Sequence, residues 1–186
     1  MSFKRNVFSY LNNWKKSAHR KPLVIRGARQ VGKTTAIKKF GEDFDNFIYL
    51  NLETDADRSL FDNDLSVHDL AQKIFIQKGI INKGETLLFI DEIQNSPRAV
   101  GMMRYFYEEM PELFVISAGS LLEIKMDTHK ISFPVGRVEY CYMYPMTFIE
   151  FLEASGENES LKIFESVPVP LWASDHLFKL FHRYSL

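Results

Sequence analysis

The residues best suited to chemistry lie in one stretch, RGARQVGKTT, at residues 26–35. Gly27, Gly32, Lys33 and Thr34 match the pattern G-x-x-x-x-G-K-[ST], in which glycines let backbone N–H groups close around a polyphosphate. Such a match arises by chance in well under about 1% of chains of this length. A glycine-rich turn with a solvated lysine is therefore the weaker interpretation. The residues expected to bind phosphate are Gly27, Ala28, Arg29, Gln30, Val31, Gly32, Lys33, Thr34 and Thr35.

The segments on either side of this loop favour the same interpretation. Residues 21–27 form a short apolar run that predicts a strand, and residues 34–40 have helical character. A strand, a loop and a helix in this order bring the loop N–H groups and the positive end of the helix to one point. The sequence therefore predicts an anion site here.

A second group of candidate residues ends the apolar run ETLLFIDE at residues 85–92. The uninterrupted run is typical of a strand buried on both faces, with Asp91 and Glu92 at its end. Asp91 can hold Mg²⁺ through water while Thr34 offers its hydroxyl directly, and Glu92 can orient and deprotonate an attacking water. The alternative is that two carboxylates end a strand at the surface.

The adjacent carboxylates also discriminate between classes of nucleotide-binding proteins. Small GTPases and nucleotide kinases generally lack the second carboxylate, whereas ATPases with an additional strand between the loop strand and the acidic strand commonly have it. The tetrapeptide NKGE at residues 82–85 is close to the guanine-reading pattern N-K-x-D. However, Glu85 replaces the aspartate, and the tetrapeptide precedes the acidic strand instead of following it. ATP is therefore the expected nucleotide.

The composition is that of a globular protein, with 186 residues of which 46% are apolar. No run of apolar residues approaches the length of about 18 residues that a membrane span needs. The N-terminus also lacks the apolar stretch of a secretory signal. We therefore expect a cytoplasmic protein without a membrane partner. Cys141 is the only cysteine, which excludes an internal disulfide. The histidines lack metal-ligand spacing and no serine lies in a G-x-S-x-G elbow, which argues against a metalloenzyme or a serine hydrolase.

Charge is distributed unevenly along the chain, although the formal net charge is −1. Residues 1–40 hold 11 Lys and Arg and no Asp or Glu, which leaves 12 basic and 24 acidic residues in the remainder. A basic N-terminal segment can steer a nucleotide or a nucleic acid towards the loop. A solvated helix face explains the same run, and we favour it, so nucleic acid is not indicated as a partner.

Hydrophobic periodicity arranges the rest of the chain as alternating strands and helices. This alternation predicts an α/β fold with a mostly parallel sheet covered on both faces. Further strands are expected at residues 46–53, 113–120 and around 135–146, and helices at 3–20, 66–78 with Ser66 as N-cap, from Ser96 and Pro97 onward, and at 147–154.

The pattern changes after Ser155. We expect a polar loop at 155–160, an extended stretch at 167–170 and a helix from 171 to the last residue. Because that helix has no stop signal, we expect the chain to be the N-terminal part of something longer. The expected division is an ATPase core at 1–155, including the N-terminal helix, and a linker with the start of a helical region at 156–186.

Four segments in order, RGARQVGKTT, LLFIDEIQ, VISAGSLLE and FPVGRVEYCYMYPMTFIEFLEA, closely resemble a prokaryotic AAA-like P-loop ATPase family. Members of this family carry a further C-terminal domain of unassigned function, and the resemblance covers about residues 20–155. It implies a three-layer α/β/α P-loop NTPase core with an additional strand. It also implies Lys33 on the β- and γ-phosphates of ATP, Thr34 and Asp91 at Mg²⁺, and Glu92 as the water activator.

Two further residues are candidates for catalysis. The resemblance places a Gly-Ser pair at 119–120, beside the loop, and implies that Ser120, or Ser117 before it, senses the γ-phosphate; an ordinary turn serine is the alternative. Arg137 stands at the entrance to an apolar strand. It either reaches a γ-phosphate, its own or that of a neighbouring subunit, or pairs with a nearby carboxylate such as Glu139.

These features predict a Mg²⁺-dependent ATPase that couples hydrolysis to an unidentified partner or to a C-terminal domain outside this sequence. Self-association is expected if Arg137 acts between subunits. The alternative is a slow nucleotide-dependent switch in which turnover is incidental.

Overall fold

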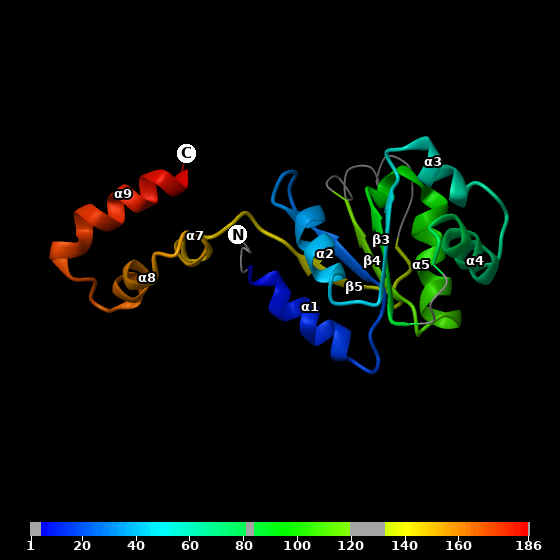
Figure 1. The fold of residues 1–186 in the computed structure, drawn as a ribbon, viewed down its shortest axis with the longest axis horizontal. Coiled ribbons are helices and arrows are strands. Elements are labelled where there is room, and N and C mark those ends of the chain that lie inside the picture. Colours follow the sequence, from blue (N-terminus) through cyan, green and yellow to red (C-terminus); the bar gives the residue numbers. More distant parts are fainter. Residues whose placement is uncertain (1–4, 81–83, 120–132, 186) are drawn as a thin grey trace.

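The protein is described by a computed structural model that covers residues 5–80, 84–119 and 133–185. Its centre is a parallel sheet between helices, and a helical extension projects from one side of this core (Figure 1). Within these ranges, no helix combines the length and the apolar character that a membrane span requires.

Five strands in the described ranges form the sheet, and every neighbouring pair runs parallel. The strand β4 lies between β1, which leads into the phosphate loop, and β3, which ends in the acidic pair. The expected additional strand is therefore confirmed. In spatial order the strands are β2 (Asn46–Asn51), β3 (Thr86–Asp91), β4 (Phe114–Ala118), β1 (Leu23–Arg26) and β5 (Glu139–Tyr142).

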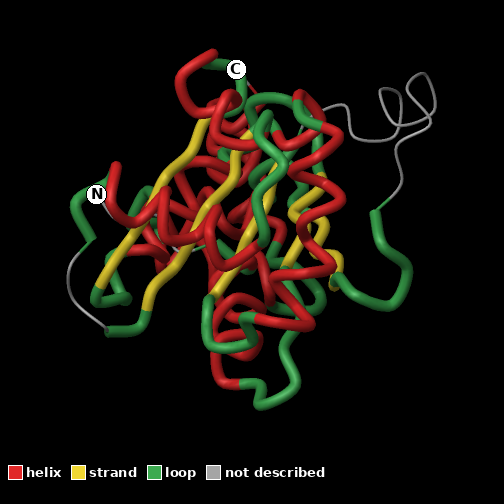
Figure 2. Tube along the Cα trace, turned by 90° about the vertical axis from the view of Figure 1, so that its right-hand side faces the viewer, coloured by secondary structure: helices red, strands yellow, loops and turns green. Residues whose placement is uncertain are grey.

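Helices cover both faces of the sheet, and Figure 2 shows the strands lying between them. One hydrophobic cluster joins the sheet to Trp14 and Ile37, and a second joins it to Leu70 and Met103 on the opposite face. The expected three-layer α/β/α core with an N-terminal helix is confirmed. The helices are α1 (Val7–Lys16) and α2 (Lys33–Gly41) on one face, and α4 (Val67–Gln77) and α5 (Pro97–Glu109) on the other.

Local signals explain where these elements begin. Ser66 accepts the N–H of Asp69 at the start of α4, and Ser96 accepts that of Ala99 before α5, whose first residue is Pro97. Both helix starts are as predicted, and β3 is buried at every position, as a strand covered on both faces requires. The shorter helices are α3 (Asp55–Arg58) and the 3-10 helices Ser59–Phe61, Ile93–Asn95 and Leu171–Ala173.

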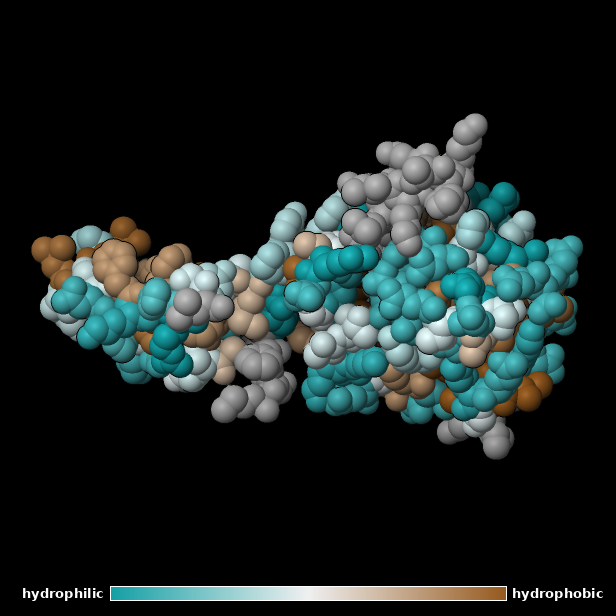
Figure 3. Space-filling view, turned by 90° about the horizontal axis from the view of Figure 1, so that it is seen from above, coloured by the Kyte–Doolittle hydropathy of each residue, from teal (hydrophilic) through white to brown (hydrophobic). Residues whose placement is uncertain are grey.

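The helical extension is held together by aromatic side chains. The ring centroid of Phe148 lies 5.2 Å from that of Phe164 and 5.3 Å from that of Phe181. Figure 3 shows apolar side chains at the surface of the far end of the extension. Within the extension, Leu171 and Trp172 are exposed. Its helices are α7 (Phe148–Ala154), α8 (Asn158–Glu165) and α9 (Ser174–Ser185).

One expectation about this region needs correction. The loop expected at residues 155–160 is wrong in its second half, because α8 begins at Asn158 and buries Ser160. The expected division at residue 155 stays a prediction, because α7 packs with α8 and α9 while its Glu150 also bonds to Arg5 of the N-terminal segment. The signal that was missed is the amphipathic pattern of α8, which starts with polar residues and so reads as a loop.

Candidate functional site

The predicted site residues meet where the parallel strands end, which we call the carboxyl edge of the sheet. Because all five strands are parallel, their carboxyl ends lie along the same edge, where α/β proteins bind ligands. The phosphate loop follows β1 there, Asp91 ends β3, and the buried Gly119 follows β4. The topology therefore brings together two segments that are about sixty residues apart in the chain.

Glycine is required at two positions of the phosphate loop. Gly27 has a φ of 152°, and a Cβ there would lie 2.2 Å from the backbone oxygen of Met143. Gly32 has a φ of 90° and immediately precedes α2, in a conformation that side chains disfavour. The loop thus fits tightly against the segment that follows β5, and any larger residue at position 27 would displace it.

Lys33 lies buried at the start of α2, 7% exposed. Its Nζ donates to the backbone oxygen atoms of Gly27, at 2.9 Å, and Ala28, at 2.7 Å. Burial lowers the pKa of this ammonium group, and the negative charges of Glu92 and Asp91 oppose that effect. The lysine charge is therefore held within the curve of the loop, at the positive end of a helix.

Asp91 connects the acidic strand to the phosphate loop. The Thr34 hydroxyl donates to its Oδ2 atom at 2.7 Å, and the Tyr49 hydroxyl approaches the same atom at 3.3 Å. Burial raises the pKa of Asp91, and the hydrogen bond from Thr34 counteracts that rise. Burial and the nearby Asp91 charge raise the pKa of Tyr49 to about 12, so the phenol stays a donor.

Glu92 has an unusual backbone conformation. Its φ of 53° and ψ of 43° lie in the left-handed region, which is uncommon for a residue with a side chain, and residues held in such conformations cluster at functional sites. The Gln94 amide donates to Glu92 Oε2. Gln94 is itself buried, and its Oε1 atom has no hydrogen-bond partner among the described residues. The turn after β3 therefore fixes the direction of the Glu92 carboxylate.

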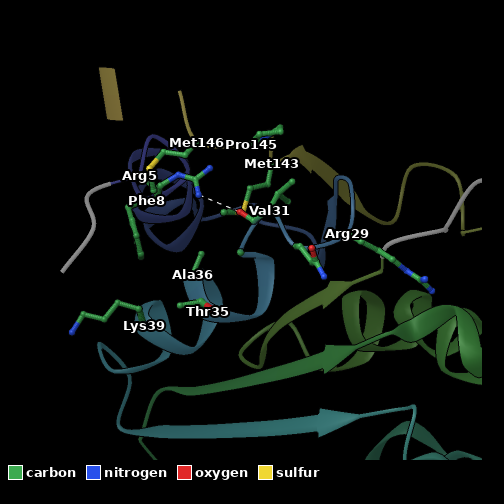
Figure 4. Close-up of a pocket in the computed structure, with 12 residues that line it drawn as sticks. Arg5, Phe8, Arg29, Val31, Thr35, Ala36, Lys39, Met143, Pro145 and Met146 are labelled. Atoms are coloured by element: carbon green, nitrogen blue, oxygen red, sulfur yellow. Dashed lines mark hydrogen bonds between the residues drawn. The ribbon is translucent and has the colours of Figure 1, made fainter. Parts of the chain in front are cut away.

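A cavity of about 750 Å³ lies beside the loop (Figure 4). Five of the predicted loop residues line it, and its other walls come from the N-terminal segment, α2 and the stretch after β5. The sequence interpretation missed these other walls because no local pattern links them to the loop. The lining residues are Arg5, Phe8, Arg29, Gln30, Val31, Gly32, Thr35, Ala36, Lys39, Met143, Pro145 and Met146.

The serine sensor is only partly addressed by the structure, since Ser120 lies outside the described residues. Ser117 is fully buried and pairs in register with Val24 and Ile90, which face the α4 and α5 layer. Asp91 follows Ile90 by one residue and therefore faces the opposite side of the sheet. Ser117 consequently does not face the side on which Thr34 meets Asp91.

Arg137 lies at the opposite end of the strands, where they begin, which we call the amino edge of the sheet. It precedes β5, whose Glu139 pairs in register with Leu23 at the amino end of β1. Arg137 Nε donates to Glu108 Oε1 at 2.7 Å, whereas Glu139 accepts the backbone N–H of Lys21. Arg137 therefore pairs with a carboxylate, that of Glu108 instead of Glu139, and it lies at the end of the strands opposite to the phosphate loop of its own chain.

The chain is similar to a known protein family in sequence and to known proteins in structure. A family model described as an AAA domain matches residues 19–152. No curated protein matches. Two structures of Drosophila ORC with Cdc6 are similar, one bound to GC-rich DNA (12% identity, TM-score 0.43, covering 95% of this chain and 68% of that chain) and one bound to AT-rich DNA (14%, 0.44, 95% and 67%). Because the family model spans well over half of the residues, the chain belongs to the AAA domain family of P-loop ATPases.

Proposed function

We propose that the chain binds ATP with Mg²⁺ and hydrolyses it to ADP and phosphate, and that this cycle is coupled to a partner or to a further C-terminal domain. The observation that carries the proposal is the 2.7 Å hydrogen bond between Thr34 Oγ1 and Asp91 Oδ2. It joins the phosphate loop to the acidic pair in the arrangement that Mg²⁺ and a triphosphate require. We also propose a cytoplasmic location, where ATP is abundant.

The residues present fit a magnesium ion. Thr34 and Asp91 offer a hydroxyl and a carboxylate, which are the hard oxygen donors that Mg²⁺ prefers. When bound, Mg²⁺ would neutralise charge on the β- and γ-phosphate oxygens. The Tyr49 hydroxyl donates a further hydrogen bond to Asp91.

The chain's own groups account for the remaining requirements. The loop N–H groups and Lys33 bind the phosphates, and the Lys33 ammonium would exchange its bonds to the Gly27 and Ala28 carbonyl oxygen atoms for bonds to phosphate oxygen. In the reaction, a water oxygen attacks the γ-phosphorus while the bond to the β–γ bridging oxygen breaks. Glu92 accepts the proton of that water, and Gln94 holds its carboxylate in position.

We assign the cavity beside the loop to the nucleoside. Its volume of about 750 Å³ lies within the range of small-molecule sites. Phe8, Met143 and Met146 supply apolar walls suited to a base, and Arg29 and Lys39 lie on its rim (Figure 4). The phosphate loop borders this cavity through Val31 and Gly32 and carries the Mg²⁺ ligand Thr34, so the parts of ATP would lie next to one another along it.

A slow nucleotide-dependent switch is the second candidate. It is favoured by the contact between Gln94 and Glu92, because a carboxylate already bonded to an amide is a weaker base. Nucleotide occupancy would then set the conformation of a partner, and hydrolysis would only reset it.

Turnover measured with and without Mg²⁺ tests the proposal. The ATPase interpretation predicts release of phosphate that is abolished by a metal chelator and that is raised by the correct partner. Tightly retained nucleotide with turnover slower than about one per minute would favour the switch. Absence of any nucleotide binding would contradict both candidates.

A further inference from the structure

The Arg5 guanidinium occupies a position between the phosphate loop and α7. Its Nη1 donates to the backbone oxygen of Val31 at 3.2 Å, its Nη2 to that of Tyr144 at 2.8 Å, and its Nε to Glu150 Oε1 at 3.1 Å. The side chain is only 12% exposed. Figure 4 shows the contact between Arg5 and Val31 at the wall of the cavity.

The contact with Val31 determines which way one peptide group of the loop faces. In a trans peptide the C=O and the following N–H point in opposite directions, so the Val31 oxygen and the Gly32 N–H are oriented together. Because the Val31 oxygen points to Arg5, the Gly32 N–H points away from it. A phosphate loop binds its anion through N–H groups that face inward, and a carbonyl in the same place would repel the anion.

Gly32 does not fix this orientation by itself. Glycine readily adopts a φ of 90°, but it adopts most other backbone conformations as readily. Reversing the Val31–Gly32 peptide would therefore cost little free energy at Gly32. A Cβ at Gly32 would lie 3.8 Å from Arg5 Nη1, so the guanidinium lies directly against this peptide. Arg5 therefore supplies the restraint that the glycine lacks.

Arg5 is itself held in place. Glu150 Oε1 accepts both Arg5 Nε and the Asn6 N–H, the latter at 2.8 Å, while Oε2 accepts the Thr147 N–H at 2.8 Å in the capping box of α7. Burial alone would raise the pKa of Glu150, but the N–H donors of Thr147 and Asn6, together with Arg5, lower it. The three acceptors suit the planar fork of arginine, which lysine does not have.

We infer that Arg5 is a positioning residue of the nucleotide site: it holds the Val31–Gly32 peptide with its N–H directed towards the phosphates. This role rests on the proposed nucleotide binding. It also ties the phosphate loop to the first turn of α7, because one guanidinium bonds to both.

The test measures ADP affinity by calorimetry and the Gly32 amide resonance by NMR in the intact chain and in Arg5→Ala. We expect ADP to bind about 10–100-fold more weakly, the loss of one charge-assisted hydrogen bond at the site. In the parent, ADP should shift the Gly32 amide resonance downfield, and in the variant this shift should be absent.

Arg20→Ala is the matched control. Arg20 Nη2 also donates to two backbone oxygen atoms, those of Pro111 at 2.8 Å and Glu112 at 3.2 Å, but far from the loop. The variant Arg20→Ala should therefore have a lower melting temperature than the parent but the same ADP affinity. If Arg5→Ala does not fold, Arg5→Lys and Glu150→Gln serve instead, each with an expected loss of affinity of about 3–30-fold.

The inference is overturned if Arg5→Ala binds ADP as the parent does, with the same shift of the Gly32 resonance. It is also overturned if Arg20→Ala weakens ADP binding as much as Arg5→Ala does. Failure of the proposed function gives a different result, because the parent itself would then show neither ADP binding nor a shift.

Discussion

The two edges of the sheet both carry charged residues but organise them differently. At the carboxyl edge Lys33 and Asp91 are buried, and each has at least two hydrogen-bond partners. At the amino edge the Arg137 side chain is 43% exposed and pairs with the exposed Glu108. Lys33, Asp91 and Arg137 were all candidates from residue type and position in the sequence.

The difference shows which charges are informative about function. Burying a charge is costly unless it is fully bonded, so buried charges that converge at one point indicate a site where a ligand repays that cost. Exposed ion pairs contribute little to stability and occur over most protein surfaces. The comparison therefore predicts that substitutions at the carboxyl edge affect nucleotide chemistry and that those at the amino edge do not.

The largest expected effect is that of Lys33→Ala. The phosphates would lose their main cationic partner inside a buried loop, so nucleotide binding should fall by at least about 100-fold, beyond detection in an ordinary titration. Fluorescent-nucleotide titration gives the affinity, and circular dichroism shows whether the variant is folded. A folded variant with the parent's affinity would show that the loop does not bind the nucleotide.

Glu92→Gln should separate binding from hydrolysis. The amide keeps the size of the side chain but cannot accept the water proton, so turnover should fall by about 10²–10⁴-fold while ATP affinity stays close to that of the parent. Single-turnover phosphate release measures the effect. A variant that hydrolyses ATP at the parent's rate would exclude Glu92 as the general base and favour the nucleotide-dependent switch.

Glu150→Gln sharpens the comparison through its dependence on pH. Because the folded-state pKa of Glu150 is lowered, the unfolded chain binds more protons between the two pKa values, and stability rises with pH across that window. The variant should be about 1–3 kcal/mol less stable than the parent at neutral pH, and the difference should shrink as the pH falls below about 4.3. Urea unfolding at several pH values tests this, and a difference independent of pH would show that the glutamate is not ionised in the folded protein.

Arg137→Ala should have the smallest effect, with hydrolysis and ATP affinity within about threefold of the parent, since it loses only an exposed ion pair. A loss of about 10³–10⁵-fold in turnover would instead assign Arg137 to the site of a neighbouring subunit. In that case, mixing the variant with Glu92→Gln should restore activity, because mixed interfaces would contain one intact site.

Much of the fold and of the site could be predicted from short-range patterns. The spacing of Gly27, Gly32, Lys33 and Thr34 predicts the loop, and the run that ends at Asp91 predicts a buried strand whose carboxyl end lies near it. Helix starts at Ser66 and Ser96 followed from capping chemistry. These features depend on residues close together in the chain, which is why the sequence reveals them.

The missed features depend on distant pairings. Arg5 and Glu150 are 145 residues apart, so no local pattern indicates that they meet at the loop. The parallel direction and register of β5 beside β1 place Arg137 at the amino edge, and a lone arginine after a glycine does not reveal on which edge it lies. The Gln94 contact with Glu92 could have been found, because the two residues are only two positions apart.

The dependence of ATP affinity on Mg²⁺, compared between the parent and Asp91→Asn, tests the central claim most directly. The asparagine keeps the shape of the side chain and an acceptor for Thr34 but removes the charge that would hold the ion. The account predicts that Mg²⁺ tightens ATP binding to the parent by about tenfold or more, or about 1.4 kcal/mol, and does not tighten binding to the variant. An equal effect of Mg²⁺ on both proteins would contradict the assignment of this edge of the sheet as the magnesium–nucleotide site.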